Sequence, residues 1–171
     1  RHTGPFAAST ANGPDWVKAE AASSLPQKTL SPRQRALGGH KLVRIITDST
    51  SSIPQDIRAE LGIEVTSLII NRNGEELVES ETDLDAFYKD IYEMADNIPT
   101  SSQPPLGKVR EVVESIAKTG DEVIGIFISS KMSGTFESFV HTAKEVKNDL
   151  PNFRFAAIDS MTNCMEMGWP V

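Results

Sequence analysis

The chain has 171 residues, of which 39% are hydrophobic, and this is enough for one domain with a real core. Its net charge of -7 argues against a nucleic-acid-binding protein, because such a surface needs clustered Lys and Arg. The single cysteine, Cys164, excludes an internal disulfide and a cysteine-based metal site, and no apolar run is long enough to span a bilayer. We therefore expect a soluble, cytoplasmic protein that binds no metal or cofactor and does not insert stably into a membrane.

Residues 1–40 differ in composition from the rest of the chain. They are rich in Ala, Ser, Gly and Pro, and their few apolar residues have no period, which is typical of a disordered arm or an interdomain linker. Trp16 and Val17 are the candidates for one short helical turn, and a tail from an upstream domain is the alternative interpretation. The character of the sequence changes at Lys41, so residues 41–171 are the predicted folded domain.

The chain is expected to be cut at both ends. It does not begin with Met, and it stops at Val171 just after residues 161–167 begin a new apolar segment. An end at this point is expected to leave Met165, Met167 and Trp169 without partners. We therefore predict that the domain is incomplete at its C-terminus.

The first part of the domain reads as a strand, a turn and a helix. Residues 42–46 are a compact apolar run with β-branched side chains, which predicts a buried strand. The polar residues 47–52 predict a turn. A short helix is expected from Pro54 toward Leu61, and Gly62 is its expected C-cap.

A second strand, a hairpin turn and a helix are predicted next. Residues 63–70 are expected to form one strand. Asn and Gly at 73–74 are a strong turn signal, with a short return strand expected at residues 77–78. Asp83 is the expected N-cap of a helix. The apolar face of that helix carries Leu84, Phe87, Tyr88, Ile91 and Tyr92.

The second half of the domain alternates between helices and strands. Residues 98–105 predict a loop that opens a helix, whose apolar stripe is Val109, Val112, Val113 and Ile116 and which Gly120 ends. Residues 123–128 predict the third main strand. The helix after Thr135 presents Phe136, Phe139, Val140, Ala143 and Val146 to a core, and residues 153–158 predict another strand.

Strands separated by helices predict an α/β fold with a mostly parallel sheet and flanking helices. Right-handed crossovers bring the carboxyl ends of such strands to one edge, where ligands bind. Four polar segments are expected at or near this edge, at residues 48–50, 100–103, 129–135 and 159–160. Their convergence is a stronger functional signal than any one of them.

The turn Ser133-Gly134-Thr135 lies between a predicted strand and a predicted helix. A helix N-terminus has unpaired N–H donors and the positive end of the helix dipole, so it attracts a carboxylate or a phosphate. The turn lacks the glycine spacing and the lysine of a P-loop, and it lacks the second glycine of a nucleophile elbow. Ser133 is therefore interpreted as an anion ligand rather than a nucleophile.

Each candidate residue also has a purely structural interpretation, which the sequence leaves open. Ser133 caps its helix in that case, and Ser101 and Ser102 only begin the helix that follows them. Asp48 and Asp159 would then be turn or cap residues, which is the favoured interpretation for both.

Four segments resemble, in their order and spacing, the N-terminal domain of the DegV family. They are residues 46–50 (ITDST), 99–104 (PTSSQP), 129–135 (SSKMSGT) and 158–160 (IDS), and the resemblance extends from Lys41 to the end of the chain. It implies an α/β fold and the binding of a long-chain fatty acid without enzymatic activity. Some members carry the acyl chain for a fatty acid kinase, so the implied partners include an acyl phosphate and a kinase, either in trans or as a fused domain similar to dihydroxyacetone kinase.

The resemblance also implies which residues form the site. The family's head-group hydroxyls come from a Thr-Ser-Gln-Pro loop and from the serine of Ser-Gly-Thr, and the matching residues here are Ser101, where threonine is usual, and Ser133. The implied lipid-binding residues are Ser101, Ser102, Ser133, Gly134 and Thr135, and the supporting residues are Asp48, Ser49, Gln103, Asp159 and Ser160. The family's second domain, which brings a histidine and basic residues to the head group, has no counterpart in this chain.

Three competing functions remain open. Asp48 directly follows a predicted strand, as the phosphoryl-accepting aspartate of a phosphatase or phosphotransfer enzyme would, although Thr50 stands where a second carboxylate is needed. A serine hydrolase based on Ser133 lacks a histidine base, since His141 is expected on the solvent side of its helix. The third possibility is an interaction domain that binds no lipid.

Overall fold

The computed structural model describes residues 41–89 and 91–171 of the chain. The predicted arm at residues 1–40, with its helical turn at Trp16 and Val17, lies outside the described residues. The division of the chain into an arm and a domain therefore stays a prediction.

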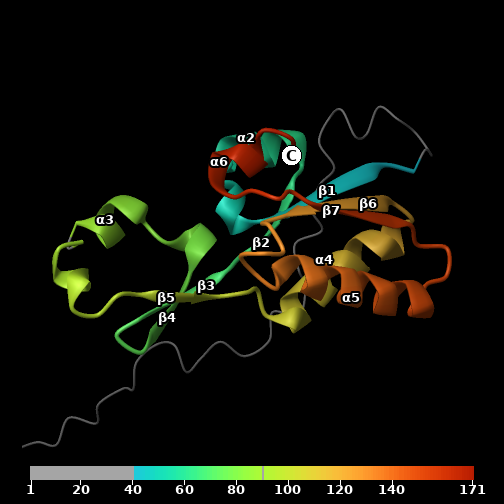
Figure 1. The fold of residues 1–171 in the computed structure, drawn as a ribbon. Helices are drawn as coiled ribbons and strands as arrows, with labels where there is room; N and C mark the ends of the chain where they lie inside the picture. Colours follow the sequence, from blue (N-terminus) through green and yellow to red (C-terminus); the bar gives the residue numbers. More distant parts are fainter. Residues whose placement is uncertain (1–40, 90) are drawn as a thin grey trace, which may run out of the picture. The chain divides into compact units, whose positions relative to one another are not determined.

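A four-stranded parallel sheet, called sheet A here, is the centre of the fold (Figure 1). Its strands are β1 (Val43–Asp48), β2 (Glu64–Thr66), β6 (Glu122–Phe127) and β7 (Phe155–Asp159), in the order β2-β1-β6-β7. In the register, Thr47 pairs with Ile126, and Ile126 pairs with Ile158. The predicted α/β fold with a mostly parallel sheet is confirmed. The first strand begins one residue later and ends two residues later than predicted, because Thr47 and Asp48 continue the ladder instead of opening the turn.

Two helices, α4 (Leu106–Thr119) and α5 (Thr135–Asp149), cover one face of sheet A and enclose the main core (Figure 1). The predicted apolar stripes of both helices are confirmed, since Val109, Val113, Phe139 and Val146 are all buried there. Phe127 and Phe139 pack with their ring centroids 4.6 Å apart. This close packing fixes α5 over the centre of the sheet, and so fixes the position of its N-terminus at the sheet edge.

The other face of sheet A carries short helical elements. They are η2 (Ser49–Ser51), α2 (Gln55–Leu61) and α6 (Cys164–Gly168), with Gly62 capping α2 in a left-handed conformation as predicted. Met167 is completely buried and packs with Ile126 and Ile128. The expectation that Met167 lacks partners is therefore wrong, whereas Met165 and Trp169 are exposed.

A second, antiparallel sheet, called sheet B here, consists of β4 (Glu75–Val78), β3 (Ile69–Arg72) and β5 (Thr100–Ser102), in that order. It corrects the prediction of one strand at residues 63–70, because β2 belongs to sheet A and β3 to sheet B. The chain changes sheets at Ser67 and Leu68, and the Leu68 amide donates to Ser49 Oγ at 2.9 Å instead of to a strand. The predicted loop at 98–105 also contains a strand, since β5 pairs with β3.

The helix predicted after Asp83 is shorter than expected. α3 spans Leu84–Tyr88, and Asp83 caps it by accepting from the Ala86 amide at 3.1 Å, as predicted. Ile91 lies beyond the helix in a turn, and Tyr92 is 92% exposed. The predicted apolar face is therefore largely on the surface, and of its five residues only Phe87 is buried.

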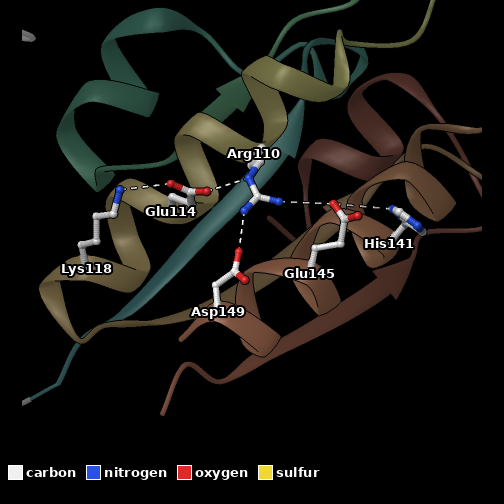
Figure 2. Close-up of polar contacts among 6 residues, drawn as sticks. All are labelled: Arg110, Glu114, Lys118, His141, Glu145 and Asp149. Carbon is white, nitrogen blue, oxygen red and sulfur yellow. Dashed lines mark hydrogen bonds and ion pairs between the residues drawn. The ribbon is translucent and has the colours of Figure 1, made fainter. Parts of the chain in front are cut away.

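Helices α4 and α5 are also joined by charged side chains on their outer surface (Figure 2). Arg110 on α4 contacts Glu145 at 3.4 Å and Asp149 at 2.6 Å on α5, and it binds Glu114 on its own helix at 2.6 Å. His141 contacts Glu145 at 3.9 Å and is 70% exposed, which confirms its predicted place on the solvent side. Among the described residues, no helix is both long and apolar enough to cross a bilayer.

Candidate functional site

The carboxyl ends of β1, β6 and β7 meet at one edge of sheet A, and two aspartates connect them. Asp48, which ends β1, accepts from the Ile128 amide at 2.9 Å, just beyond β6. Asp159, which ends β7, accepts from the Ser130 amide at 3.1 Å and from the Ser130 hydroxyl at 2.6 Å. Three of the four predicted polar segments are therefore held together at this edge.

Asp48 is completely buried, and its second oxygen accepts from both the amide and the hydroxyl of Thr50. Burial raises the pKa of Asp48, because the loss of solvation disfavours the carboxylate more than the hydrogen bonds from Thr50 and Ile128 favour it. Every oxygen of this side chain is thus engaged inside the protein. The geometry does not suit the phosphatase interpretation, in which this carboxylate must reach a phosphoryl group.

The pKa of Asp159 is shifted in the opposite direction from that of Asp48. The hydrogen bond from the Ser130 hydroxyl, followed by that from the Met161 amide, lowers the pKa of Asp159. Asp159 therefore stays ionised and organises the turn that begins at Ser130. For both aspartates the contacts match the structural interpretation that the sequence favoured, because each one ties strand ends together.

The turn at residues 129–135 leads directly into α5. The Ser133 amide donates to the Ser129 carbonyl at 3.1 Å, which closes the turn. The Ser133 hydroxyl lies 2.8 Å from the Thr135 hydroxyl and accepts from the Thr135 amide at 3.3 Å. Ser133 is half-buried and Thr135 is buried. The two hydroxyls therefore lie together at the N-terminus of α5.

Gln103 connects the 100–103 segment to the same helix start. Its Oε1 accepts from the Ser138 hydroxyl at 2.9 Å, one turn into α5. It also lies directly over Gly134, where an added Cβ would come within 2.9 Å of Oε1. Ser101 and Ser102, which immediately precede Gln103, are exposed on β5. The fourth predicted segment is therefore brought to the N-terminus of α5.

Two supporting residues, Ser49 and Ser160, form hydrogen bonds away from the Ser133 turn. The Ser49 hydroxyl donates to Glu79 and accepts from the Leu68 amide, so it joins η2 to the start of sheet B. The Ser160 hydroxyl donates to the Thr162 carbonyl at 3.0 Å within its own turn. Both side chains shape the backbone near the edge, and none of the hydrogen bonds of these two hydroxyls within the described residues reaches the Ser133 turn.

Sequence reasoning missed Ser138 and Ser130. Ser130 lies within the predicted segment 129–135 but was not singled out, and Ser138 lies just beyond it; each forms a hydrogen bond across more than 25 residues of sequence. Ser138 lies four residues after Gly134, on the α5 face above the helix start, and this spacing is the signal that would have identified it.

A separate pocket of about 560 Å³ lies between the β3–β4 hairpin and α3. None of the predicted site residues lines it. Its lining residues are Arg72, Glu76, Leu77, Val78, Glu81, Thr82, Asp83, Ala86 and Phe87. Within residues 41–89 and 91–171, no group of three or more His, Cys, Asp or Glu side chains is arranged to hold a metal ion.

The family model described as "Uncharacterised protein, DegV family" matches residues 42–171. This chain belongs to the DegV family. It is 40% identical, over 127 residues, to a DegV domain-containing protein of Clostridium perfringens, and 32% identical, over 128 residues, to Protein DegV of Bacillus subtilis. Each alignment covers 74% of this chain and 44% of the relative, so the chain spans less than half the length of these curated relatives.

Solved structures of DegV proteins have the same fold. The crystal structure of DegV from Bacillus subtilis, described as a fatty acid binding protein, matches with a TM-score of 0.65 at 31% identity and covers 76% of this chain and 45% of that one. A DegV family protein from Thermus thermophilus, described by its fatty acid binding, matches with a TM-score of 0.65 at 29% identity, covering 75% and 44%.

Proposed function

We propose that this chain binds a long-chain fatty acid and holds its carboxylate between β5 and the N-terminus of α5. The residues in contact with the carboxylate would be Ser101, Ser102, Ser133, Gly134 and Thr135. The single observation that supports this most strongly is the hydrogen bond between Gln103 and Ser138. This bond joins α5 to the residue that directly follows the exposed Ser101 and Ser102, and the amides of a helix N-terminus need an acceptor.

The Ser133 hydroxyl is suited to donate to an anion. Either hydroxyl of the Ser133–Thr135 pair can be the donor. When Thr135 donates to Ser133, the proton of Ser133 is left to donate outward. Each hydrogen bond to a carboxylate contributes about 1.5–3 kcal/mol, and the helix dipole adds about 0.3–1 kcal/mol.

The acyl tail would supply most of the affinity. Each buried methylene contributes about 0.8 kcal/mol, so roughly ten methylenes outweigh the head-group contacts. The hydroxyls therefore orient the carboxylate more than they hold the molecule. Fatty acid binding by DegV proteins that are about 30% identical to this chain supports this assignment.

Presentation of the bound carboxylate to a fatty acid kinase is the finer part of the proposal. A carboxylate held at an exposed serine-rich rim stays accessible to an ATP-binding protein, which would form an acyl phosphate. The kinase acts in trans or as a fused domain similar to dihydroxyacetone kinase. Incubation with a bacterial fatty acid kinase, ATP and palmitate is expected to yield palmitoyl phosphate only when this chain is present.

Binding is tested with the 171-residue chain after removal of co-purified lipid. Titration with palmitate, followed by native mass spectrometry, is expected to show one bound acyl chain. Ser133→Ala and Ser101→Ala are expected to weaken palmitate binding several-fold. The same substitutions are expected to leave binding of methyl palmitate, the methyl ester that lacks the carboxylate charge, nearly unchanged.

Ser115→Ala is the matched control, because Ser115 is an exposed serine on α4 whose hydroxyl only donates to the Val112 carbonyl at 2.8 Å. It is expected to bind palmitate like the unmodified chain. Absence of any bound acyl chain would refute the lipid-binding proposal. Equal losses for palmitate and its methyl ester in the serine variants would refute the assigned head-group role.

A further inference from the structure

The negative charge of this protein is concentrated in residues 75–98, which we call the acidic segment. It contains nine Asp and Glu residues and one Lys, a net charge of -8, whereas the whole chain carries -7. The rest of the chain therefore sums to +1. The acidic segment includes β4, α3 and the short helices η3 (Glu79–Glu81) and η4 (Glu93–Ala95). Its charge is a local property of this region and not a general feature of the surface.

Large apolar side chains are exposed within the same acidic segment. Tyr92 is 92% exposed and Ile98 is 75% exposed, and Leu84, Tyr88 and Ile91 are each about half exposed. Single exposed apolar residues are ordinary, but a group of them bordered by charges is typical of a binding surface. None of these five side chains is buried among the described residues, so each remains available for contact with a partner.

The pocket between the β3–β4 hairpin and α3 belongs to this surface. Its lining combines apolar side chains, including Leu77 and Phe87, with the carboxylates of Glu76, Glu81 and Asp83. Apolar walls beside carboxylates suit a long side chain with an aliphatic stem and a cationic end. Arg72, whose guanidinium lies 5.4 Å from the Phe87 ring centroid, already shows this mode of packing inside the pocket.

We propose that the acidic segment is a docking surface for a basic segment of a partner protein that carries apolar anchor residues between its Lys or Arg side chains. The positive charge of such a partner segment would complement the net charge of -8 on the acidic segment. A second copy of the chain would oppose one -8 surface to another, and an anionic lipid surface would be repelled in the same way. The inference does not depend on the proposed fatty acid site, because it rests on different residues.

The test uses the full 171-residue chain and a synthetic helical peptide of about 12 residues with Lys and Leu on one face. Chemical shifts of backbone amides are followed by NMR during the titration. The expected shifts are confined to residues 72–98 and weaken as salt rises, because exposed charges are screened. A peptide with Ser in place of Leu, and one with Glu in place of Lys, are both expected to bind at least about ten-fold more weakly.

Two pairs of substitutions separate docking from general charge attraction. Tyr92→Ser with Ile98→Ser removes exposed apolar anchors, and Glu81→Gln with Asp85→Asn removes two charges at exposed positions of the acidic segment. Each pair is expected to weaken binding of the Lys-Leu peptide about five-fold or more. The control pair Asp56→Asn with Glu60→Gln removes two exposed charges from α2 and is expected to leave the affinity unchanged.

The proposal is overturned if the control pair weakens binding as much as the Glu81 and Asp85 pair, since attraction would then follow net charge alone. It is also overturned if the peptide shifts map outside residues 72–98. Binding of phosphatidylglycerol vesicles in preference to the peptide would point to a membrane surface instead. Self-association that the Tyr92 and Ile98 substitutions abolish would identify a second copy as the occupant.

Discussion

Gln103 and Ser138 lie 35 residues apart in the chain, and their side chains form a hydrogen bond of 2.9 Å that joins the end of β5 to the first turn of α5. Gln103 also covers Gly134, whose missing side chain leaves room for the amide. This contact links the segment that carries Ser101, which is itself paired with Ile70 in sheet B, to the helix that follows Ser133.

Replacement of Gly134 by Ala is expected to displace Gln103. The added Cβ would lie 2.9 Å from Gln103 Oε1, while the backbone φ of -76° suits alanine without strain. We expect Gly134→Ala to change the amide shifts of Ser101 and Ser102 and to weaken palmitate binding several-fold. The double variant with Gln103→Ala is expected to bind no worse than Gln103→Ala alone, because both changes break the same contact. Additive losses would contradict this coupling.

Stability is expected to depend on pH through Asp48. Because its pKa is raised in the folded protein, the folded state keeps the proton to higher pH than the unfolded state. The contribution of Asp48 is thus fully present below the ordinary aspartate pKa of about 3.9 and is lost as pH rises through the raised value. The free energy of unfolding relative to Asp48→Asn is expected to fall over this range, as measured by urea unfolding.

Asp159 serves as the comparison at the same sheet edge. Its pKa is lowered, so its contribution is present above the ordinary aspartate pKa and is lost as pH falls through the lower folded value. Relative to Asp159→Asn, the unmodified chain is therefore expected to lose stability on acidification. If both aspartates gave the same sign, the assigned environments would be wrong.

Gly125 is expected to tolerate no side chain. An alanine Cβ there would lie 2.5 Å from Phe139 Cε1 and 2.6 Å from Phe127 Cε2, where these two rings pack against each other. Gly125→Ala should therefore destabilise the fold by about 1–3 kcal/mol through overpacking. Gly107→Ala is the control, since nothing lies within 4 Å of its Cβ position in α4, and alanine there should raise stability by about 0.5 kcal/mol.

The charged contacts of Arg110 are expected to contribute little to stability. Hydrogen bonds to Asp149 and Glu114 raise the pKa of Arg110, but all of these side chains lie on the outer surface of α4 and α5 (Figure 2). Arg110→Gln should lower the urea midpoint slightly at low salt, and the difference should vanish at about 1 M salt, where charges are screened within about 3 Å. A large loss that persists at high salt would show that the network organises the helix pair.

Local patterns were sufficient for three strands of sheet A, β1, β6 and β7, and for the two long helices. The apolar runs of β1 and β6 and the stripes of α4 and α5 repeat at the periods of strand and helix, and these periods depend only on neighbouring residues. The convergence of Asp48, Ser130 and Asp159 at one edge followed from the connection of parallel strands by helices.

The features that local patterns did not predict depend on contacts between segments that are distant in the sequence. Residues 63–70 are rich in β-branched and other apolar side chains, and their division between two sheets depends on the Leu68 amide donating to Ser49 rather than to a strand. The Gln103–Ser138 contact and the exposure of Tyr92 likewise depend on which surfaces meet in three dimensions. Periodicity reports which side of an element is apolar, but it does not report which other element, or which other molecule, will cover it.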